Sequence, residues 1–412
     1  MNILLVDLWT DANRGDNSLQ AGLIKMCRKR WPDCTVNAVF RFGTNEFEFA
    51  KKEIGYTSEL LDEVSGGLRR TYYSEHYNNK FSRITHKLLS LVSFLELSIF
   101  FILISIRCDF LFGKKNRKTL KLYRRADIII WKGKNFRLYG GLAGLQRQLT
   151  LTIGGIIASW FKKPLYCVNA SFWDVTNSFE SHILKFAFRK CEKITVRDRP
   201  SLINAKKLLE GTEIIFAQDL SFYDLHDRML NFKPTKDAEK FDLAITLTDW
   251  GSSDERTAYL DAISGFLAAI STKQKINVCI VPQVTRAAED NSAMIEYFKD
   301  HTELNCNFTI IPGAPTIDDL LLIYSNCKFL IGTRMHSCVF AFVVGTPFVA
   351  IGYDYGPKWM ILKEFWDENL ILDYGNLKNQ EFDFFSAFNE KHTAKALLAD
   401  LASESFLNVK FL

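Results

Sequence analysis

The sequence lacks the cysteine spacing that marks a disulfide framework or a metal site. Its nine cysteines are scattered over 412 residues, with no C-x-x-C pair. Disulfide scaffolds and zinc sites place their cysteines at short, regular intervals. The pattern therefore predicts reduced thiols in a cytoplasmic protein, and it ranks metal binding and thiol redox chemistry low among the functions.

Long runs of one charge are also absent. The formal net charge is only +5, and the lysines and arginines are dispersed along the chain. A protein that binds nucleic acid gathers basic residues on one face or in one segment. We therefore expect no nucleic-acid partner, and a local basic site fits the sequence better than a basic face.

The sequence also lacks a signal peptide and a dinucleotide-binding loop. Met1 leads directly into an apolar run, without the basic region and cleavage site of a signal peptide. No G-x-G-x-x-G loop follows that run, so a nicotinamide or flavin cofactor is not predicted. The chain also shows no internal repeat and no low-complexity tract.

One apolar stretch, residues 88–106, is nearly long enough to span a bilayer. Glu96 lies near its midpoint, where a carboxylate is costly in hydrocarbon, so we reject a transmembrane helix. Two interpretations remain open. The stretch is a buried helix or helical hairpin, or it docks a cytoplasmic protein on the inner face of the cytoplasmic membrane, aided by its basic flanks.

What the sequence does contain is a regular alternation of short apolar runs with longer helical patterns, which predicts an α/β fold with parallel sheets. The runs predict strands at residues 3–8, 35–40, 127–131, 165–169, 193–196, 213–216, 243–247, 277–281, 308–311, 329–331 and 348–351. The patterns between them predict helices at residues 18–30, 142–160, 179–189, 201–209, 255–269, 291–298, 317–324 and 337–344.

The length of the chain exceeds what one hydrophobic core usually supports. A polar stretch without periodicity, at residues 227–240, interrupts the alternation and is typical of a linker. We predict two Rossmann-like lobes that face a cleft. They span residues 1–230, with a hydrophobic helical insertion near 83–118, and residues 231–380, followed by a helical tail over 381–412 that packs back on the first lobe.

The densest group of polar residues follows the strand predicted at 329–331. Arg334, His336 and Ser337 stand where that strand ends and a helix begins, a place where free backbone N–H groups favour an anion. The next strand ends just before Tyr353 and Lys358. We therefore predict that these residues form one rim of the second lobe, able to bind and protonate an anionic substrate.

A second motif, Gly15-Asp16-Asn17, lies between the first strand and the first helix. Gly15 can supply a tight turn, and Asp16, Asn17 and Ser18 are all suitable helix N-caps. Capping alone is one interpretation of this motif. The other gives the Asp16 carboxylate a role in binding sugar hydroxyls or in acting as a base.

Two further candidates lie at strand ends of the first lobe. Lys132 and Lys134 flank a glycine, and they either contact an anion or are solvated loop charges. Arg197 stands at a strand-to-helix junction, where it either reaches an anion in the cleft or forms a local surface arrangement with Asp198.

Taken together, these motifs resemble the polysaccharide pyruvyl transferase family. The matching segments are Gly15-Asp16-Asn17, Val196-Arg197-Asp198, Arg334-Met335-His336-Ser337, Gly345-Thr346-Pro347, and Tyr353-Asp354 with Lys358. The sequence departs from the family pattern in two places. The glycine cluster after the strand at 127–131 is reduced to Gly133, and Tyr355-Gly356-Pro357 is inserted before Lys358.

The resemblance implies a GT-B-like fold and transfer of the enolpyruvyl group of phosphoenolpyruvate to two hydroxyls of a sugar. The product is a pyruvate ketal, and phosphate is released. In this scheme His336 is the general acid, Arg334 stabilises the departing phosphate, and Asp16 acts on the acceptor from the opposite lobe. Substrate binding is assigned to Gly15, Asn17, Lys132, Arg197, Ser337, Tyr353 and Lys358. No metal or cofactor is required.

The implied acceptor is a sugar or a lipid-linked oligosaccharide destined for a cell-surface polysaccharide such as a capsule or an exopolysaccharide. Two other functions remain open. The same two-lobed cleft could serve a GT-B-type glycosyltransferase that uses a nucleotide sugar. The reduced glycine cluster would also fit a non-catalytic carbohydrate-binding member of the same fold.

Overall fold

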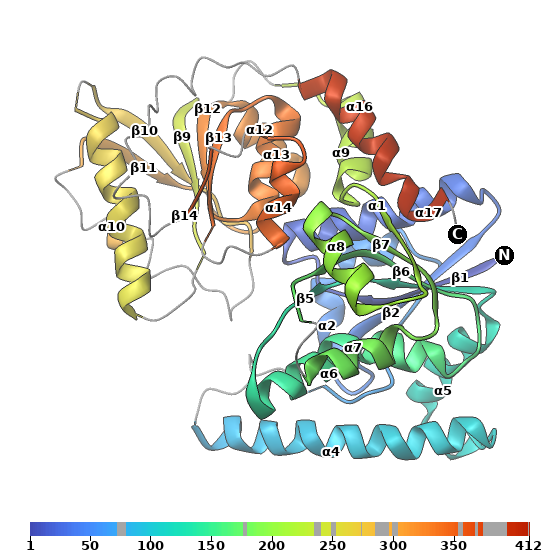
Figure 1. Ribbon diagram of the computed structural model, residues 1–412. Helices are drawn as coiled ribbons and strands as arrows, with labels where there is room; N and C mark the ends of the chain where they lie inside the picture. The colour runs from blue at the N-terminus through green and yellow to red at the C-terminus, as the bar shows by residue number, and fades with distance from the viewer. Residues whose placement is uncertain are drawn as a thin grey trace. The chain divides into compact units, whose positions relative to one another are not determined.

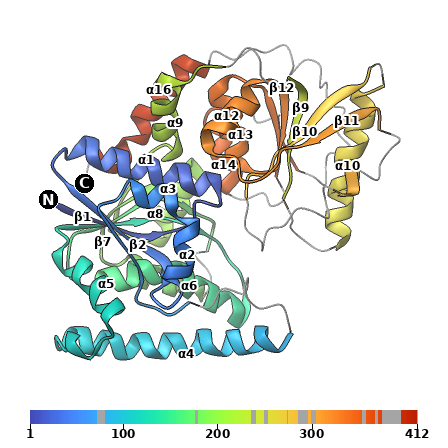
Figure 2. The same ribbon diagram turned by 180° about the vertical axis from the view of Figure 1, so that it is seen from behind.

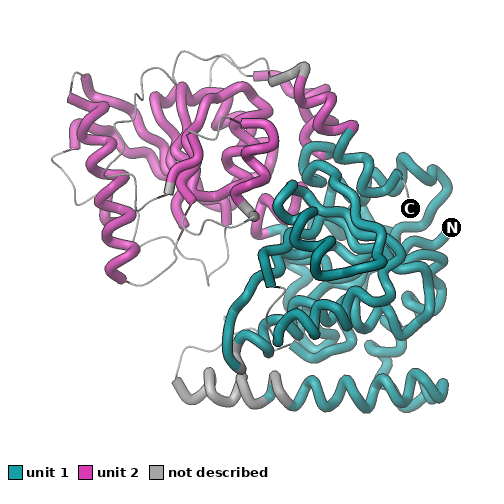
Figure 3. Tube along the Cα trace, in the orientation of Figure 1, with its two compact units in different colours: residues 1–11, 19–223, 404–412 teal, residues 12–18, 224–403 magenta. Residues whose placement is uncertain are grey.

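The computed structural model describes most of the chain, namely residues 1–71, 80–175, 179–234, 240–248, 253–272, 274–284, 296–298, 304–352, 357–366, 370–373, 394–410 and 412. This part divides into two compact units (Figure 3). Unit 1 comprises Met1–Asp11, Leu19–Tyr223 and Glu404–Leu412, and unit 2 comprises Ala12–Ser18 and Asp224–Ser403.

Unit 1 is built on a parallel sheet in the order β3-β2-β1-β4-β6-β7-β8, with β5 paired to β6 (Figures 1 and 2). Its strands are β1 (Asn2–Leu8), β2 (Thr35–Gly43), β3 (Glu63–Gly67), β4 (Ile128–Lys132), β5 (Asn135–Phe136), β6 (Leu165–Phe172), β7 (Cys191–Val196) and β8 (Glu213–Phe216). All six strands predicted for the first half are confirmed. β3 was not predicted, because Glu-Val-Ser-Gly-Gly contains a single strong strand former.

The helices of unit 1 cover both faces of this sheet. Alternate residues of β1 enter different cores, with Leu4 and Val6 in one and Ile3 and Leu5 in the other. Burial on both faces explains why the strands read as continuous apolar runs. The helical elements are most of α1 (Arg14–Arg30), α2 (Phe47–Ala50), η1 (Lys51–Glu53), α3 (Gly55–Glu59), α4 (Lys80–Ser105), η3 (Asp109–Leu111), α5 (Lys114–Arg125), α6 (Gly141–Ser159), α7 (Glu180–Phe188), α8 (Arg199–Leu208), the start of α9 (Ser221–Asn231) and α17 (Leu407–Lys410). The rest of α9, from Asp224 on, belongs to unit 2.

Unit 2 contains a second parallel sheet in the order β11-β10-β9-β12-β13-β14. Its strands are β9 (Phe241–Thr246), β10 (Ile276–Ile280), β11 (Cys306–Ile310), β12 (Cys327–Gly332), β13 (Phe348–Gly352) and β14 (Ile371–Asp373). Its helices are α10 (Ser253–Ile270), α12 (Ile317–Ser325), α13 (Met335–Val344), α14 (Pro357–Lys363) and α16 (Ala394–Ser405). The five predicted strands are confirmed, and most of the helix predicted at 291–298 lies outside the described residues.

Both sheets have the doubly wound order in which the direction of winding reverses once. The reversal falls between β1 and β4 in unit 1 and between β9 and β12 in unit 2. In open α/β sheets ligands bind outside the carboxyl ends of the strands at such a reversal. The predicted fold class, α/β with two Rossmann-like lobes, is therefore confirmed, and each unit has one expected location for a site.

The unit boundaries differ from those expected from the sequence. The chain passes between the units within α9, after Tyr223, rather than at residue 230. Residues 12–18 group with unit 2, and residues 404–412 group with unit 1, where the Asn408 side chain donates to the Gln218 carbonyl at 2.9 Å. The linker was predicted from a break in the alternation of strands and helices along the sequence. The boundary of a compact unit depends instead on contacts between segments that are distant in the sequence, which that alternation does not show.

The hydrophobic insertion expected near 83–118 is occupied by α4, η3 and the start of α5. Within the described residues, no helix combines the length and the apolar character that crossing a bilayer requires.

Candidate functional site

The carboxyl ends of β9 and β12 carry the first part of the candidate site. β12 ends at Gly332, and Arg334 is the N-cap residue of α13, with extended backbone angles. The Arg334 Nε donates to the Leu247 carbonyl, just beyond β9, at 3.3 Å. Arg334 and His336 are both half-buried. The predicted pair thus lies at the winding reversal of the second sheet.

Buried hydroxyl groups fix the backbone that carries this pair. The Tyr259 hydroxyl donates to Thr333 Oγ1 at 3.0 Å, and the Thr248 hydroxyl donates to the Thr333 carbonyl at 3.1 Å. The Ser337 hydroxyl lies 2.9 Å from Thr246 Oγ1 and also bonds to the Arg334 carbonyl. Thr333 and Ser337 are fully buried. Ser337, predicted to bind substrate, therefore ties the start of α13 to the end of β9.

Cys338, next in α13, is not a candidate nucleophile. Its side chain is fully buried, and this burial raises the pKa of the thiol well above its usual range. A cysteine acts as a nucleophile through its thiolate, so Cys338 has a packing role.

The Gly15-Asp16-Asn17 motif lies in the first turn of a helix rather than in a loop. α1 begins at Arg14, and the Asn13 Oδ1 accepts hydrogen bonds from Gly15 N at 3.0 Å and Asp16 N at 3.5 Å. Asn13 is thus the N-cap. The predicted tight turn at Gly15 and the predicted caps at Asp16, Asn17 and Ser18 are wrong, because the helix starts four residues earlier than expected.

Backbone contacts hold this helix start within unit 2. Asn13 forms an antiparallel bridge with Val284, and Arg14 N donates to the Gln283 carbonyl at 3.3 Å. The Arg14 guanidinium donates to the carbonyls of Pro315 and Ala314. Asp16 was expected to reach the site from the opposite lobe. It instead belongs to the same unit as His336.

Gly15 brings the two motifs of unit 2 together. A Cβ built on Gly15 would lie 2.2 Å from His336 Nδ1 and 2.6 Å from His336 Cγ, far inside van der Waals contact. Only glycine lets the imidazole lie against the first turn of α1. His336 therefore packs against Gly15, and the half-buried Asp16 follows Gly15 in the first turn of α1. We refer to these three residues as the cluster.

Two more residues, Lys358 and Tyr353, were predicted to bind substrate. Lys358 lies in the first turn of α14. The prediction for Tyr353 falls outside the described residues.

The remaining candidates, Lys132 and Arg197, belong to unit 1. Lys132 ends β4 and is buried, and the Lys134 Nζ donates to the Asp7 carbonyl at 2.7 Å. Both lysines are therefore not solvated loop charges. Lys132 stands at the winding reversal of the first sheet.

Arg197 belongs to a buried network beyond β7. Its Nη1 pairs with Asp219 Oδ2 at 3.0 Å, and its Nε donates to Ser171 Oγ at 2.9 Å. Asp198 is the N-cap of α8, and burial raises the pKa of its carboxyl group. The expected surface arrangement of Arg197 with Asp198 is wrong, because both side chains are buried.

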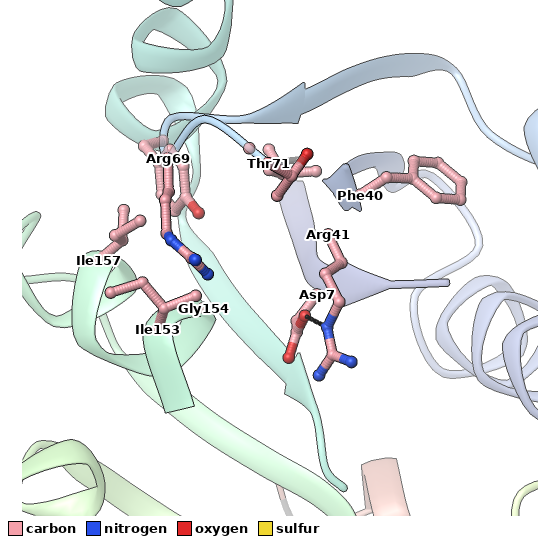
Figure 4. Close-up of a pocket in the computed structure, with 11 residues that line it drawn as sticks. Asp7, Phe40, Arg41, Arg69, Thr71, Ile153, Gly154 and Ile157 are labelled. Carbon is pink, nitrogen blue, oxygen red and sulfur yellow. Dashed lines mark hydrogen bonds and ion pairs between the residues drawn. The ribbon is translucent and has the colours of Figure 1, made fainter. Parts of the chain in front are cut away.

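The structure also shows a pocket at the carboxyl edge of the first sheet that the sequence did not indicate (Figure 4). Asp7, at the end of β1, pairs with Arg41 through a 3.0 Å contact between Oδ1 and Nε. The Arg69 Nε donates to Ser93 Oγ at 3.1 Å. The pocket is lined by Asp7, Val39, Phe40, Arg41, Gly67, Arg69, Thr71, Tyr123, Ile153, Gly154 and Ile157.

Asp7 was not predicted as a site residue because it lies within an apolar run that predicts a strand. Its backbone adopts φ 66°, and the register of β1 against β2 shifts between Val6 and Leu8. Aspartate is one of the few residues that enter the left-handed region readily. A charged residue next to the end of an apolar strand is the one signal that could have drawn attention to it.

We expect Asp7→Asn to lower the free energy of unfolding by about 1.5 kcal/mol, because a buried hydrogen-bonded charge is lost. Asparagine tolerates the same backbone angles, so the effect reports the charge that faces Arg41 and Lys134. Urea denaturation measures it. Asp109→Asn, in a partly exposed pair with Arg124, is the control and should change stability by less than about 1 kcal/mol.

Comparison with known proteins gives both a family match and distant relatives. Residues 13–355 match the model of a family described as polysaccharide pyruvyl transferase. The chain is 22% identical over 373 residues to the amylovoran biosynthesis protein AmsJ of Erwinia amylovora. The match covers 86% of this chain and 84% of that protein.

Solved structures share the fold at low sequence identity. Alr3699/HepE of Anabaena, solved with UDP-glucose, is 13% identical with a TM-score of 0.50, covering 100% of this chain and 99% of that one. A putative UDP-N-acetylglucosamine 2-epimerase of Listeria monocytogenes is 10% identical with a TM-score of 0.53, covering 99% and 93%. These likenesses concern the fold alone, and they agree with a GT-B-like class.

Proposed function

Because the chain belongs to the polysaccharide pyruvyl transferase family, we propose that it moves the enolpyruvyl group of phosphoenolpyruvate onto two hydroxyls of a sugar. The products are a pyruvate ketal and inorganic phosphate. The similarity to AmsJ, a protein of amylovoran biosynthesis, supports a role in making an exopolysaccharide. Phosphoenolpyruvate is the donor substrate, and the reaction needs no metal or redox cofactor.

The single observation that carries the proposal is the close approach of His336 to Gly15 in unit 2, with Asp16 and Arg334 near them in the chain. It combines a proton donor, a carboxylate and a guanidinium group. The cluster stands at the winding reversal of a doubly wound sheet, where ligands of this fold class bind. A reaction that joins an anionic donor to a hydroxyl needs these three kinds of group.

His336 is assigned the acid step. A proton added to C3 of the enol lets a first sugar oxygen bond to C2 as that hydroxyl loses its proton. The bond from C2 to the phosphate oxygen then breaks, and the phosphate departs with the electron pair. The second hydroxyl adds to C2 and loses its proton, which completes the ketal. Histidine is the residue type suited to proton transfer at neutral pH.

Arg334 and Asp16 are assigned the charge and base roles. A guanidinium group binds phosphate and carboxylate through paired hydrogen bonds, so Arg334 stabilises charge on the departing phosphate. Its 3.3 Å bond to the Leu247 carbonyl orients the side chain at the strand end. The Asp16 carboxylate, next to Gly15 in the first turn of α1, accepts the proton of an attacking hydroxyl.

The test is a phosphate-release assay with phosphoenolpyruvate and a panel of free and lipid-linked sugar acceptors. We expect release only when both donor and acceptor are present. Release from neither set of acceptors, with donor binding retained, would favour a non-catalytic carbohydrate-binding protein.

A nucleotide-sugar glycosyltransferase is the second candidate, because Alr3699/HepE was solved with UDP-glucose on the same fold. A thermal-shift comparison separates the two functions, since a ligand that binds the folded state stabilises it by an amount that grows with the ligand concentration relative to its Kd. We expect phosphoenolpyruvate to raise the melting temperature and UDP-sugars to leave it unchanged. The opposite result would support the glycosyltransferase.

A further inference from the structure

Helix α4 is apolar on two sides, and one side packs into unit 1. Leu97 and Ile104 are buried in the core, and the Phe100 ring meets Phe112 edge-on with centroids 4.8 Å apart. The Arg69 guanidinium lies over the Phe94 ring at 4.2 Å. These contacts fix one face of α4 as an ordinary packing face.

The other side of α4 presents apolar residues to solvent. Val92, Leu95, Ile99 and Ile102 of α4, and Ile106 directly after its last residue, follow one another at intervals of three and four residues, the spacing of a single helix face. Each of them is more than half exposed. We call this row the α4 stripe. In Figures 1 and 2 α4 forms the outermost layer of its unit.

The stripe continues beyond the end of the helix. Phe110 and Leu111 of η3 are also more than half exposed. Isolated exposed apolar residues are common on protein surfaces, but seven of them between residues 92 and 111 mark a surface that binds something.

The charges around the stripe are basic. Exposed lysines and arginines follow it in the chain: Arg107, Lys114, Lys115, Arg117, Lys118 and Lys121. The two acidic residues in this segment of the chain, residues 92–121, are engaged in ion pairs: Glu96 with Arg70 at 3.2 Å and Asp109 with Arg124 at 2.7 Å. The sequence before the stripe is also basic, with Lys80, Arg83 and Lys87.

We propose that the α4 stripe and its basic flanks dock this protein on the surface of an anionic lipid bilayer. Exposed apolar side chains enter the boundary between headgroups and acyl chains, and the flanking cations meet anionic headgroups. The buried face of α4 stays in the protein core, so the helix lies in the plane of the interface. The proposal goes beyond the transferase reaction and does not depend on it.

Charge favours a lipid surface over a second copy of the chain. If the stripes of two copies packed together, a basic flank of one copy would face a basic flank of the other, whether the two helices ran parallel or antiparallel. Like charges in close contact are destabilising. An anionic bilayer offers the opposite charge along the whole row.

The experiment is flotation of the full chain with vesicles of phosphatidylcholine, alone or mixed with phosphatidylglycerol. We expect flotation with the anionic mixture only. Raising the salt from about 0.1 M to about 1 M shortens the screening length from about 10 Å to about 3 Å and should weaken binding. Flotation that is equal with both lipids and insensitive to salt would show that the basic flanks do not contribute to binding, and it would overturn docking on an anionic bilayer.

Two matched variants test the stripe. Leu95→Gln/Ile99→Gln/Ile102→Gln should lower vesicle binding by about tenfold or more, because it removes apolar groups from the interface. Ile203→Gln/Leu230→Gln changes two equally exposed apolar residues on α8 and α9 and should bind as the unaltered chain does. Equal loss in both variants, or in neither, would contradict the proposal.

The oligomeric state separates a bilayer from a second copy. Sedimentation of the unaltered chain and of the triple variant should give the same mass. A dimer that the triple variant abolishes, without flotation on anionic vesicles, would assign the stripe to self-association and overturn membrane docking.

Discussion

Replacing His336 with alanine is expected to lower the rate of phosphate release from phosphoenolpyruvate and acceptor by about 10²- to 10⁴-fold, because a positioned general acid usually accelerates a reaction by that factor. The imidazole is half-buried and lies against the first turn of α1, so it is held in place rather than mobile on the surface. The measurement is the initial rate of phosphate release at saturating donor.

Two further variants make this result specific. His336→Gln keeps a polar side chain but cannot carry the proton, so it should be about as inactive as His336→Ala. His182→Ala changes an exposed histidine of α7 in the other unit and should leave the rate unchanged. Near-normal turnover in His336→Ala, with an unaltered melting temperature, would remove His336 from the acid role.

The core strands of the fold could be predicted because each of them, unlike β3, is an apolar run of its own. Burial on both faces of a parallel sheet makes β1, β4, β9 and β12 stand out from their neighbours in the sequence. The order of strands in each sheet is a tertiary property. It follows from which runs pair, so the winding reversals became visible only in the structure.

The same distinction applies to the site. Arg334, His336 and Ser337 are close in sequence, so their position at a strand end followed from the local pattern. The contact of Gly15 with His336 joins segments more than 300 residues apart, and no local pattern encodes it. Sequence indicated that Gly15 mattered but attributed this to a turn, whereas the structure shows close packing in a helix.

Gly15→Ala is expected to lower the rate of phosphate release by about 10²-fold, because a displacement of about 1 Å in a catalytic group has an effect of that size. The added Cβ would overlap the imidazole at 2.2 Å from Nδ1, so the ring has to shift. Gly265→Ala is the matched control. Gly265 also lies within a helix, α10, but a Cβ there would meet no atom within 4 Å.

Stability measurements decide whether the imidazole is the cause. Alanine is favoured over glycine in a helix by up to about 1 kcal/mol, so Gly265→Ala should stabilise the protein slightly. In the presence of His336 the overlap opposes this gain at Gly15. In the His336→Ala background the ring is gone, and only the Cβ of residue 336 remains close, at 3.0 Å from the added Cβ, so Gly15→Ala should be less destabilising than in the unaltered chain. A double-mutant cycle by urea denaturation measures this coupling. Identical effects of Gly15→Ala in both backgrounds would show that Gly15 does not position His336, and the assignment of the cluster as one unit would fail.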